Sequence, residues 1–148
     1  MRRSVDAPLV RRARGRGEHG AALALRRTVF CEEQGVAEEL EVDGRDDEAV
    51  HLVALDGDRV VGTCRLLLDG AAARFGRLAV ARAHRGRGTG GALLAAAEDH
   101  ARTAGAKRMA LAAQVGARGL YARQGFGECG EPFEEAGIEH VTMEKRLA

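Results

Sequence analysis

Glycine and arginine residues are concentrated in one short segment, residues 82–91, with the sequence RAHRGRGTGG. A strand-like run precedes this segment and a helical run follows it, so several backbone N–H groups without nearby Cβ atoms lie where a helix begins. Such N–H groups, together with the positive end of the helix dipole, bind anions. Arg82, Arg85 and Arg87 add full positive charges. The segment therefore predicts an anion cradle that suits a pyrophosphate.

Two well-known phosphate loops fit this segment poorly. Gly86, Gly88 and Gly91 spell the G-x-G-x-x-G pattern of dinucleotide-binding domains, but that fold needs a long series of alternating strands and helices. Only 34 residues follow Gln114, where the next predicted strand ends. The P-loop of nucleotide hydrolases requires G-K-[ST], and the segment has no lysine. A surface glycine loop without any ligand is the remaining alternative.

The elements around the loop form a mixed pattern of strands and helices. Apolar periodicity predicts helices over residues 18–32, 92–103 and 117–124, and the acidic stretch 34–48 is expected to be a loop or a short helix. Strand-like runs that meander first and then alternate with helices indicate one mixed α/β (α+β) domain. The predicted strands span residues 9–13, 49–55, 60–68, 73–80, 107–113, 126–129 and 138–145.

Two motifs in order resemble those of the GNAT superfamily of N-acetyltransferases. Arg85-x-x-Gly88-x-Gly90 is similar to its acyl-CoA motif, R/Q-x-x-G-x-G/A. Residues 117–126, ARGLYARQGF, resemble its A-x-x-L-Y-x-x-x-G-F segment and hold Tyr121, the only tyrosine of the chain. One predicted helix and one predicted strand separate the motifs, as in that superfamily. The ordered pair is more specific than either motif alone.

Two further segments resemble the ElaA-like group within that superfamily. They are residues 29–36, VFCEEQGV, and residues 133–143, FEEAGIEHVTM, so the resemblance extends from about residue 22 to residue 147. Two positions depart from the group. Ala37 stands where proline is frequent, and Gly76 stands where several relatives have a carboxylate that could act as the catalytic base.

The resemblance implies a single GNAT domain over residues 1–148, in which residues 1–8 are expected to be a flexible or edge segment. The implied fold has a mixed, mostly antiparallel sheet of six or seven strands with about four flanking helices. The two central strands are expected to splay apart. Many relatives are dimers, so the resemblance also allows a homodimer.

The implied activity is transfer of an acetyl group from acetyl-CoA to a primary amine by direct attack in a ternary complex. Tyr121 would donate a proton or hydrogen bond to the departing thiolate, or instead would only pack in the core. An acyl-CoA sensor with little catalysis is the alternative function. The implied CoA-binding residues are Leu78, Ala79 and Val80 for the pantetheine arm, Arg85, Gly86, Arg87, Gly88, Thr89, Gly90 and Gly91 for the pyrophosphate, and Gln114 and Tyr121 at the splay.

The reaction also needs a base, because an alkyl amine with a pKa near 10.4 is mostly protonated at neutral pH. The candidates are Glu32, Glu33, His51 and His140. His140 lies in a group-specific segment, although it could equally satisfy a structural hydrogen bond. Glu33 and Gln34 would line the acceptor pocket, or instead would end a solvated helix. We therefore name Tyr121, His140 and Glu33 as the expected catalytic residues. An acyl-cysteine relay through Cys31 or Cys129 is disfavoured, because neither has a base nearby in the sequence.

Composition excludes several other classes of protein. The 148 residues are 45% hydrophobic with a net charge of +1, which argues against a nucleic-acid binder, and no apolar run suggests a signal peptide or a membrane span. A cytoplasmic enzyme is expected. The three cysteines and five histidines lack metal-ligand spacing, so no metal is expected, and Cys64 is predicted to be a small buried residue.

Charge is nonetheless segregated along the chain. Residues 1–27 contain eight arginines and two acids, residues 31–48 contain nine acids and one arginine, and residues 127–148 contain six glutamates. If the acidic stretches meet opposite the cofactor, the acceptor side would be negative and would attract a cationic amine, while residues 74–87 would attract CoA. Nucleic-acid binding by the arginine-rich N-terminus is a second alternative function.

Overall fold

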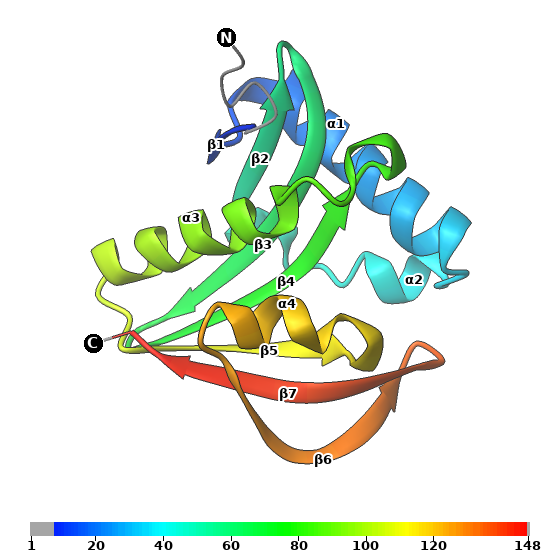
Figure 1. Ribbon diagram of the computed structural model, residues 1–148. Coiled ribbons are helices and arrows are strands. Elements are labelled where there is room, and N and C mark those ends of the chain that lie inside the picture. The colour runs from blue at the N-terminus through cyan, green and yellow to red at the C-terminus, as the bar shows by residue number, and fades with distance from the viewer. Residues whose placement is uncertain (1–7, 148) are drawn as a thin grey trace, which may run out of the picture.

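A computed structural model describes residues 8–147, which form one seven-stranded sheet in the order β1-β2-β3-β4-β5-β7-β6 (Figure 1). The expected mixed sheet with four α-helices is confirmed. Of the residues expected to be a flexible or edge segment, 1–7 lie outside the described part of the chain. The strands are β1 (Leu9–Arg12), β2 (Val50–Asp56), β3 (Arg59–Asp69), β4 (Ala72–Val80), β5 (Arg108–Gln114), β6 (Gly127–Glu135) and β7 (Ile138–Arg146). The helices are α1 (Gly15–Arg26), α2 (Glu38–Glu41), α3 (Thr89–Thr103) and α4 (Arg118–Arg123).

The two central strands, β4 and β5, diverge along their length. They pair in parallel only from Ala72 opposite Arg108 to Phe75 opposite Leu111, whereas all other neighbours in the described sheet are antiparallel. Beyond Phe75, β4 continues beside β3 and β5 continues beside β7, so the sheet opens into a V (Figure 1). The expected splay is confirmed.

Helices cover the two faces of the sheet differently. The main core lies between the sheet and α3, which packs Leu93, Leu94 and Ala97 against strands β1 to β4. On the opposite face, α1 packs against β3 and β4 near the other end of the sheet (Figure 1). The same face of β5 and β7 has small or polar side chains, Ala110 and Ala112 among them. Where β4 and β5 are paired, α3 therefore covers one face of the sheet, and no helix covers the other face of β5 and β7 in the described part of the chain.

Strand β4 contains a bulge where it leaves β5. Thr63 of β3 pairs with Ala79 and Arg65 pairs with Gly76, so Arg77 and Leu78 together face one residue of β3. Arg77 takes a positive φ of 52°, a conformation that costs an L-residue about 1–2 kcal/mol. The bulge turns the following strand away from β5.

Three elements differ from their predicted bounds by more than one residue. The first helix begins at Gly15 and its last part, Arg27–Glu33, is a π-helix, a widened turn that apolar periodicity does not reveal. Helix α3 begins at Thr89 instead of residue 92, because Gly90 and Gly91 are helical residues as well as loop glycines. Strand β6 extends to Glu135 instead of residue 129, with an irregularity between Cys129 and Phe133 that hides its alternation.

Gly62 of β3 permits the close approach of α3 to the sheet. A Cβ atom there would lie 3.0 Å from both Leu93 Cδ1 and Thr89 Cγ2 and 3.2 Å from Ala54 Cβ. We expect Gly62→Ala to lower the free energy of unfolding by about 1–3 kcal/mol, as overpacking in cores does, measured by denaturant titration. Gly76→Ala in β4 is the matched control, because its Cβ would meet nothing within 4 Å. Equal stability of the two variants would contradict the proposed packing role.

Candidate active site

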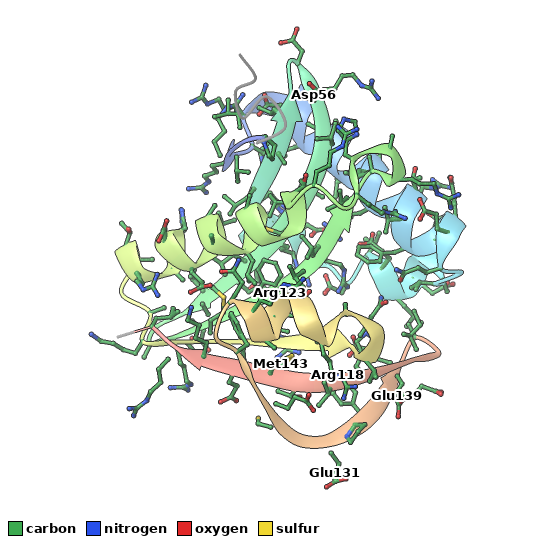
Figure 2. The ribbon with its side chains drawn as sticks, viewed as in Figure 1. Asp56, Arg118, Arg123, Glu131, Glu139 and Met143 are labelled. Atoms are coloured by element: carbon green, nitrogen blue, oxygen red, sulfur yellow. The ribbon has the colours of Figure 1, made fainter. Side chains whose placement is uncertain are left out.

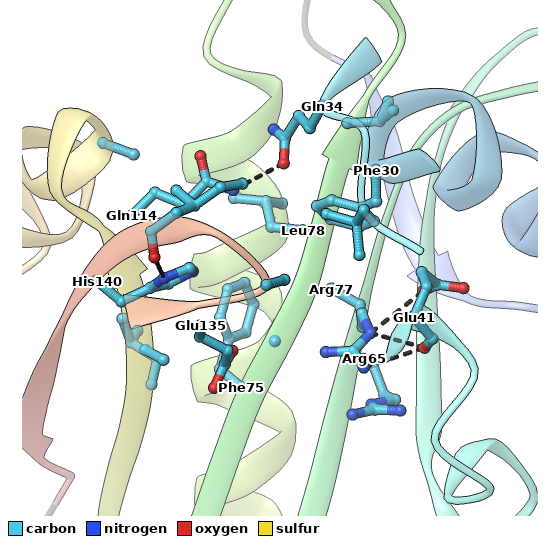
Figure 3. Close-up of a pocket in the computed structure, with 18 of the residues that line it drawn as sticks. Phe30, Gln34, Glu41, Arg65, Phe75, Arg77, Leu78, Gln114, Glu135 and His140 are labelled. Carbon is cyan, nitrogen blue, oxygen red and sulfur yellow. Dashed lines mark hydrogen bonds and ion pairs between the residues drawn. The ribbon is translucent and has the colours of Figure 1, made fainter. Parts of the chain in front are cut away.

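A cleft of about 760 Å³ occupies the splay between β4 and β5. Its walls come from β4, β5, the ends of the β6–β7 hairpin, α4 and the segment that follows α1. Figure 3 shows Leu78 and Gln114 on the two diverging strands, with His140 beside β5 and Phe30 opposite. The π-helix places Val29, Phe30 and Glu33 on this wall. Residues that are distant in the sequence thus meet where the sheet opens.

The glycine loop lies at the rim of this cleft and leaves a row of backbone donors free. Six consecutive N–H groups, from Gly86 to Gly91, have no acceptor among residues 8–147, and the first helical bond is from the Ala92 N–H to the Gly88 carbonyl. Gly86 and Gly88 have φ angles of 76° and 83°. Such left-handed turns aim successive N–H groups at one point. The geometry agrees with the anion cradle expected from the sequence.

The side chains of the loop have several distinct partners. Arg85 donates from Nε to the Val80 carbonyl at 2.9 Å and from Nη2 to Glu33 Oε1 at 2.8 Å. Arg82 lies 3.8 Å from the same carboxylate. Thr89 is buried, and its hydroxyl faces the His84 carbonyl at 3.5 Å. The exposed Arg87 forms no ion pair with the described residues and remains available to an anion.

Two of the loop glycines also serve packing. A Cβ on Gly91 would lie 3.3 Å from Gln124 Nε2, and one on Gly90 would lie 3.5 Å from Leu120 Cδ2. Gln124 Nε2 in turn donates to the Gly91 carbonyl at 3.2 Å. These glycines let α4 approach the first turn of α3, so α4 is held beside the loop. Gly90 lines the cleft, whereas Gly91 faces α4.

The part of β4 beyond the splay has a free edge toward β5. Leu78 and Val80 line the cleft, while the side chain of Ala79 is buried in the core on the other face. The pairing with β5 stops at Phe75, so peptide groups on that edge lack a strand partner there. An extended chain of amides could pair with this edge, as the sequence comparison implies for residues 78–80.

Tyr121 of α4 lies at the base of the cleft and is only 7% exposed. Its ring makes edge-to-face contacts with Phe75 and Phe126, at centroid distances of 6.2 and 6.3 Å. The hydroxyl has no hydrogen-bond partner among residues 8–147, yet it is not sealed from the cleft. Burial raises the pKa of this phenol to about 12. Tyr121 is therefore both a core residue and a protonated donor facing the cleft.

His140 of β7 faces the cleft from the opposite wall. Its Nδ1 lies 2.7 Å from the Ile138 carbonyl, and its ring stacks on Phe133 at 5.8 Å. A carbonyl can only accept, so the proton is on Nδ1 and the lone pair of the neutral ring is on Nε2. Nε2 has no partner within the described chain and is accessible. The structural hydrogen bond and the catalytic assignment are thus compatible, because they use different nitrogens.

A hydrogen bond between two glutamine side chains connects the two walls of the cleft. Gln114, the last residue of β5, donates from Nε2 to Gln34 Oε1 at 2.9 Å (Figure 3). Gln34 follows the π-helix and lines the cleft together with Glu33. Gln114 lies at the splay, as expected. The bond ties the segment after α1 to the far strand of the V.

Other candidate bases are less well placed. Glu33 lines the cleft, but its carboxylate is engaged by Arg85. His51 lies outside the cleft and bonds to the Asp46 carbonyl at 2.9 Å, and Glu32 is also not part of the cleft lining. A catalytic role of Glu33 stays a prediction, and its carboxylate contacts Arg85 of the glycine loop.

Cysteine chemistry is not favoured at this site. Cys31 and Cys129 do not line the cleft, and partial desolvation together with nearby carboxylates raises the pKa of both thiols above the ordinary value. Cys64 is 1% exposed, which confirms the expected small buried residue.

The acidic stretch 31–48 does not give the acceptor side a negative charge of its own. Glu41, 5% exposed, pairs with the buried Arg26 at 2.6 Å and with Arg77 at 3.2 Å. Two hydrogen bonds from Arg65 hold the pKa of Asp43 well below its usual range. Glu41 and Asp43, the acids of this stretch that line the cleft beside the bulge, are therefore paired with arginines and do not give the acceptor side the expected negative charge.

The arginines of residues 74–87 likewise divide between two sites. Arg82, Arg85 and Arg87 belong to the glycine loop, whereas Arg77 points away from it toward Glu41 (Figure 3). Arg74 lines the cleft below the splay. The sequence predicted that all of residues 74–87 would attract CoA. In the structure only the arginines of residues 82–87 lie on the glycine loop.

No cluster of three or more histidine, cysteine or acidic residues that could hold a metal occurs in the described part of the chain. Within residues 8–147, no helix is long and apolar enough to cross a membrane.

Comparison with known proteins agrees with the splayed sheet and its loop. Residues 17–147 match the family model described as an acetyltransferase (GNAT) domain. The chain belongs to the GNAT family of acetyltransferases. A relative from Bacillus subtilis (strain 168), named uncharacterized N-acetyltransferase YjcF, is 35% identical over 125 residues, which cover 84% of this chain and 89% of YjcF. The protein is a GNAT-type N-acetyltransferase, and enzymes of this family use acetyl-CoA.

Solved structures of related acyltransferases share the fold of this chain. An acyl-CoA N-acyltransferase from Pseudomonas aeruginosa is 29% identical with a TM-score of 0.80, covering 93% of this chain and 97% of its own. Escherichia coli ElaA is 26% identical with a TM-score of 0.84, covering 93% and 99%. The resemblance to ElaA seen in the sequence is confirmed.

Proposed function

We propose that this GNAT protein transfers an acetyl group from acetyl-CoA to a primary amine by direct attack within a ternary complex. The observation that carries the proposal is the cleft in the splay, which has a protonated phenol on one wall and an accessible imidazole nitrogen on the other. A hydrogen-bond donor and a proton acceptor on opposite sides of one cavity suit an acyl transfer between two substrates.

The residues present fit the cofactor. The free N–H groups from Gly86 to Gly91, with Arg87 beside them, would hold the diphosphate. The open edge of β4 at Leu78 and Val80 would pair with the pantetheine amides. When bound, acetyl-CoA supplies an acyl group attached to a sulfur leaving group.

Two side chains would each handle one proton in the reaction. His140 Nε2 would accept a proton from the amine as the C–N bond forms. Tyr121 would donate to the sulfur as the C–S bond breaks. A phenol with a pKa of about 12 is a weak acid toward a free thiolate of pKa near 8.5, so a strong hydrogen bond is its main contribution. Gln34 and Gln114 would hold the walls around these groups.

An assay for thiol release tests the proposal. The protein is incubated with acetyl-CoA and a panel of amino acids, polyamines, aminoglycosides and short peptides. Turnover that depends on the acceptor, with the acetylated amine detected by mass, is the expected result. Tight CoA binding without turnover on any acceptor would contradict it and would favour an acyl-CoA sensor.

A substitution in the loop tests the cofactor assignment. We expect Gly88→Ala to weaken CoA binding by about tenfold, because an L-residue at this φ costs about 1–2 kcal/mol and shifts the N–H groups. Gly130→Ala is the matched control, since Gly130 has a φ of 82° but lies in β6 away from the cleft. CoA affinity is measured by titration calorimetry. Similar affinities for the two variants would remove the loop from the binding site.

A further inference from the structure

Ionic partners account for most of the charged side chains that line the acceptor half of the cleft. Arg65 and Arg77 bind Asp43 and Glu41, and Arg45 pairs with Glu48 at 2.8 Å. The second cation on Glu41 is Arg26, which also pairs with Asp46 at 2.8 Å. This network contains three arginines and three acids around the bulge, besides the Arg45 pair, and is neutral in sum.

Two lining charges remain without an ionic partner in the described chain: Arg74 and Glu135. Arg74 is an exposed residue of β4, located between the buried Ala73 and Phe75. Because neighbouring strand residues point to opposite faces, its side chain is on the open face of the sheet. It lies one residue before β4 and β5 separate and pairs with Ala110, whose methyl group is too small to cover it. On the far side of β5, Glu144 of β7 pairs with Ala110, and Glu144 forms no ion pair with Arg74.

Glu135 is placed beside the reactive nitrogen. It is the last residue of β6 and pairs with Ile138, while Phe133 pairs with His140. Residues two apart on a strand share a face, so Glu135 and His140 are on the same side of the hairpin. Figure 3 shows both on the same wall of the cleft. By contrast, Glu131 and Glu139 project outward from the hairpin (Figure 2).

The cleft thus offers one uncompensated anion beside the proposed base and one uncompensated cation near the closed end of the splay. A carboxylate attracts an ammonium group, and a guanidinium with five donors binds a carboxylate through paired hydrogen bonds. We infer that the acceptor is an amine that also carries a carboxylate, an amino acid or a short peptide with a free C-terminus, with its amine at Glu135 and His140 and its carboxylate at Arg74. The inference rests on the proposed function.

Pairs of amines that differ only in the carboxylate test this inference. Lysine is compared with cadaverine and ornithine with putrescine, and a dipeptide with its C-terminal amide separates peptides from free amino acids. We expect kcat/KM to be at least about tenfold higher for the carboxylated member of a pair, the size expected of a charge-assisted hydrogen bond. Titration calorimetry on the CoA-loaded protein measures the same preference without turnover.

Variants assign the preference to particular side chains. Arg74→Gln should reduce the lysine-to-cadaverine ratio by about tenfold, and Arg74→Lys should keep part of it. Glu135→Gln should weaken both amines alike, because both carry the ammonium group. Arg59→Gln is the control, since Arg59 is an exposed strand arginine outside the cleft.

The results separate this inference from the proposed function. Turnover of cadaverine equal to that of lysine would overturn the inference and leave the acetyltransferase assignment intact. An unchanged ratio in Arg74→Gln would also overturn it. Absence of both binding and turnover for every carboxylated amine would contradict it as well, whereas binding without turnover would count against the proposed chemistry alone.

Discussion

Tyr121→Phe is expected to lower kcat by about 100- to 1000-fold while CoA affinity changes little. The range is that found when one donor to a developing negative charge is removed from an active site. The phenol has no hydrogen-bond partner among the described residues, so its hydroxyl is available to the leaving sulfur. Its pKa of about 12 means that it carries its proton at every pH at which the enzyme would be assayed.

The phenylalanine variant is also a clean structural substitution. The ring contacts with Phe75 and Phe126 do not need the hydroxyl, so the core is retained. Single-turnover rates and CoA titrations measure the two effects separately. Phe126→Leu is a useful control, because it disturbs the same aromatic cluster without removing a donor. A normal rate in Tyr121→Phe would mean that Tyr121 serves packing only.

His140→Asn is expected to lower kcat/KM by about 100- to 10,000-fold near neutral pH, the usual contribution of general acid–base catalysis. The asparagine amide can still donate to the Ile138 carbonyl in place of Nδ1, so the local structure should persist. Only the basic nitrogen is lost. His100→Asn on α3 is the matched control, since His100 does not line the cleft.

The pH profile of the His140 variant identifies the missing step. Without a base, the rate should follow the fraction of free amine and rise about tenfold per pH unit up to the amine pKa near 10.4. The profile of the parent enzyme should be flatter over the same range. Parallel profiles, with a uniform loss of rate, would indicate that His140 positions the acceptor without taking its proton.

Local features of this fold were predictable from the sequence. The glycine loop and the segment around Tyr121 are each continuous in the chain, and their chemistry depends on backbone N–H groups and one side chain. The helices and strands that flank them follow simple hydrophobic periods. The splayed sheet, which only the resemblance to the GNAT superfamily implied, also agrees with the expectation.

The acceptor wall was not predictable in the same way. Whether Glu41 is a free acid or half of a buried ion pair depends on Arg26 and Arg77, which come from other elements. Arg74 looks like its arginine neighbours in the sequence, yet the bulge after Gly76 sends Arg77 toward α2 and leaves Arg74 alone on the open face. Charge patterns along a chain do not specify which partners the fold will supply.

Gly76 illustrates a related limit. The sequence shows only that a frequent carboxylate is missing there. The structure shows that Gly76 lines the cleft and that nothing lies within 4 Å of where its Cβ would be. The space left by the missing side chain belongs to the acceptor region, which shifts the search for a base to the β6–β7 hairpin.

The position of Tyr121 gives the protein a built-in optical reporter. The chain has no tryptophan and one tyrosine, so with excitation at wavelengths that phenylalanine does not absorb, its intrinsic emission comes from a single ring at the base of the cleft. Substrates that reach this ring should alter its quantum yield directly. Cofactor binding, acceptor binding and product release can then be followed by stopped-flow fluorescence in the unlabelled enzyme, with each signal assigned in advance to one residue.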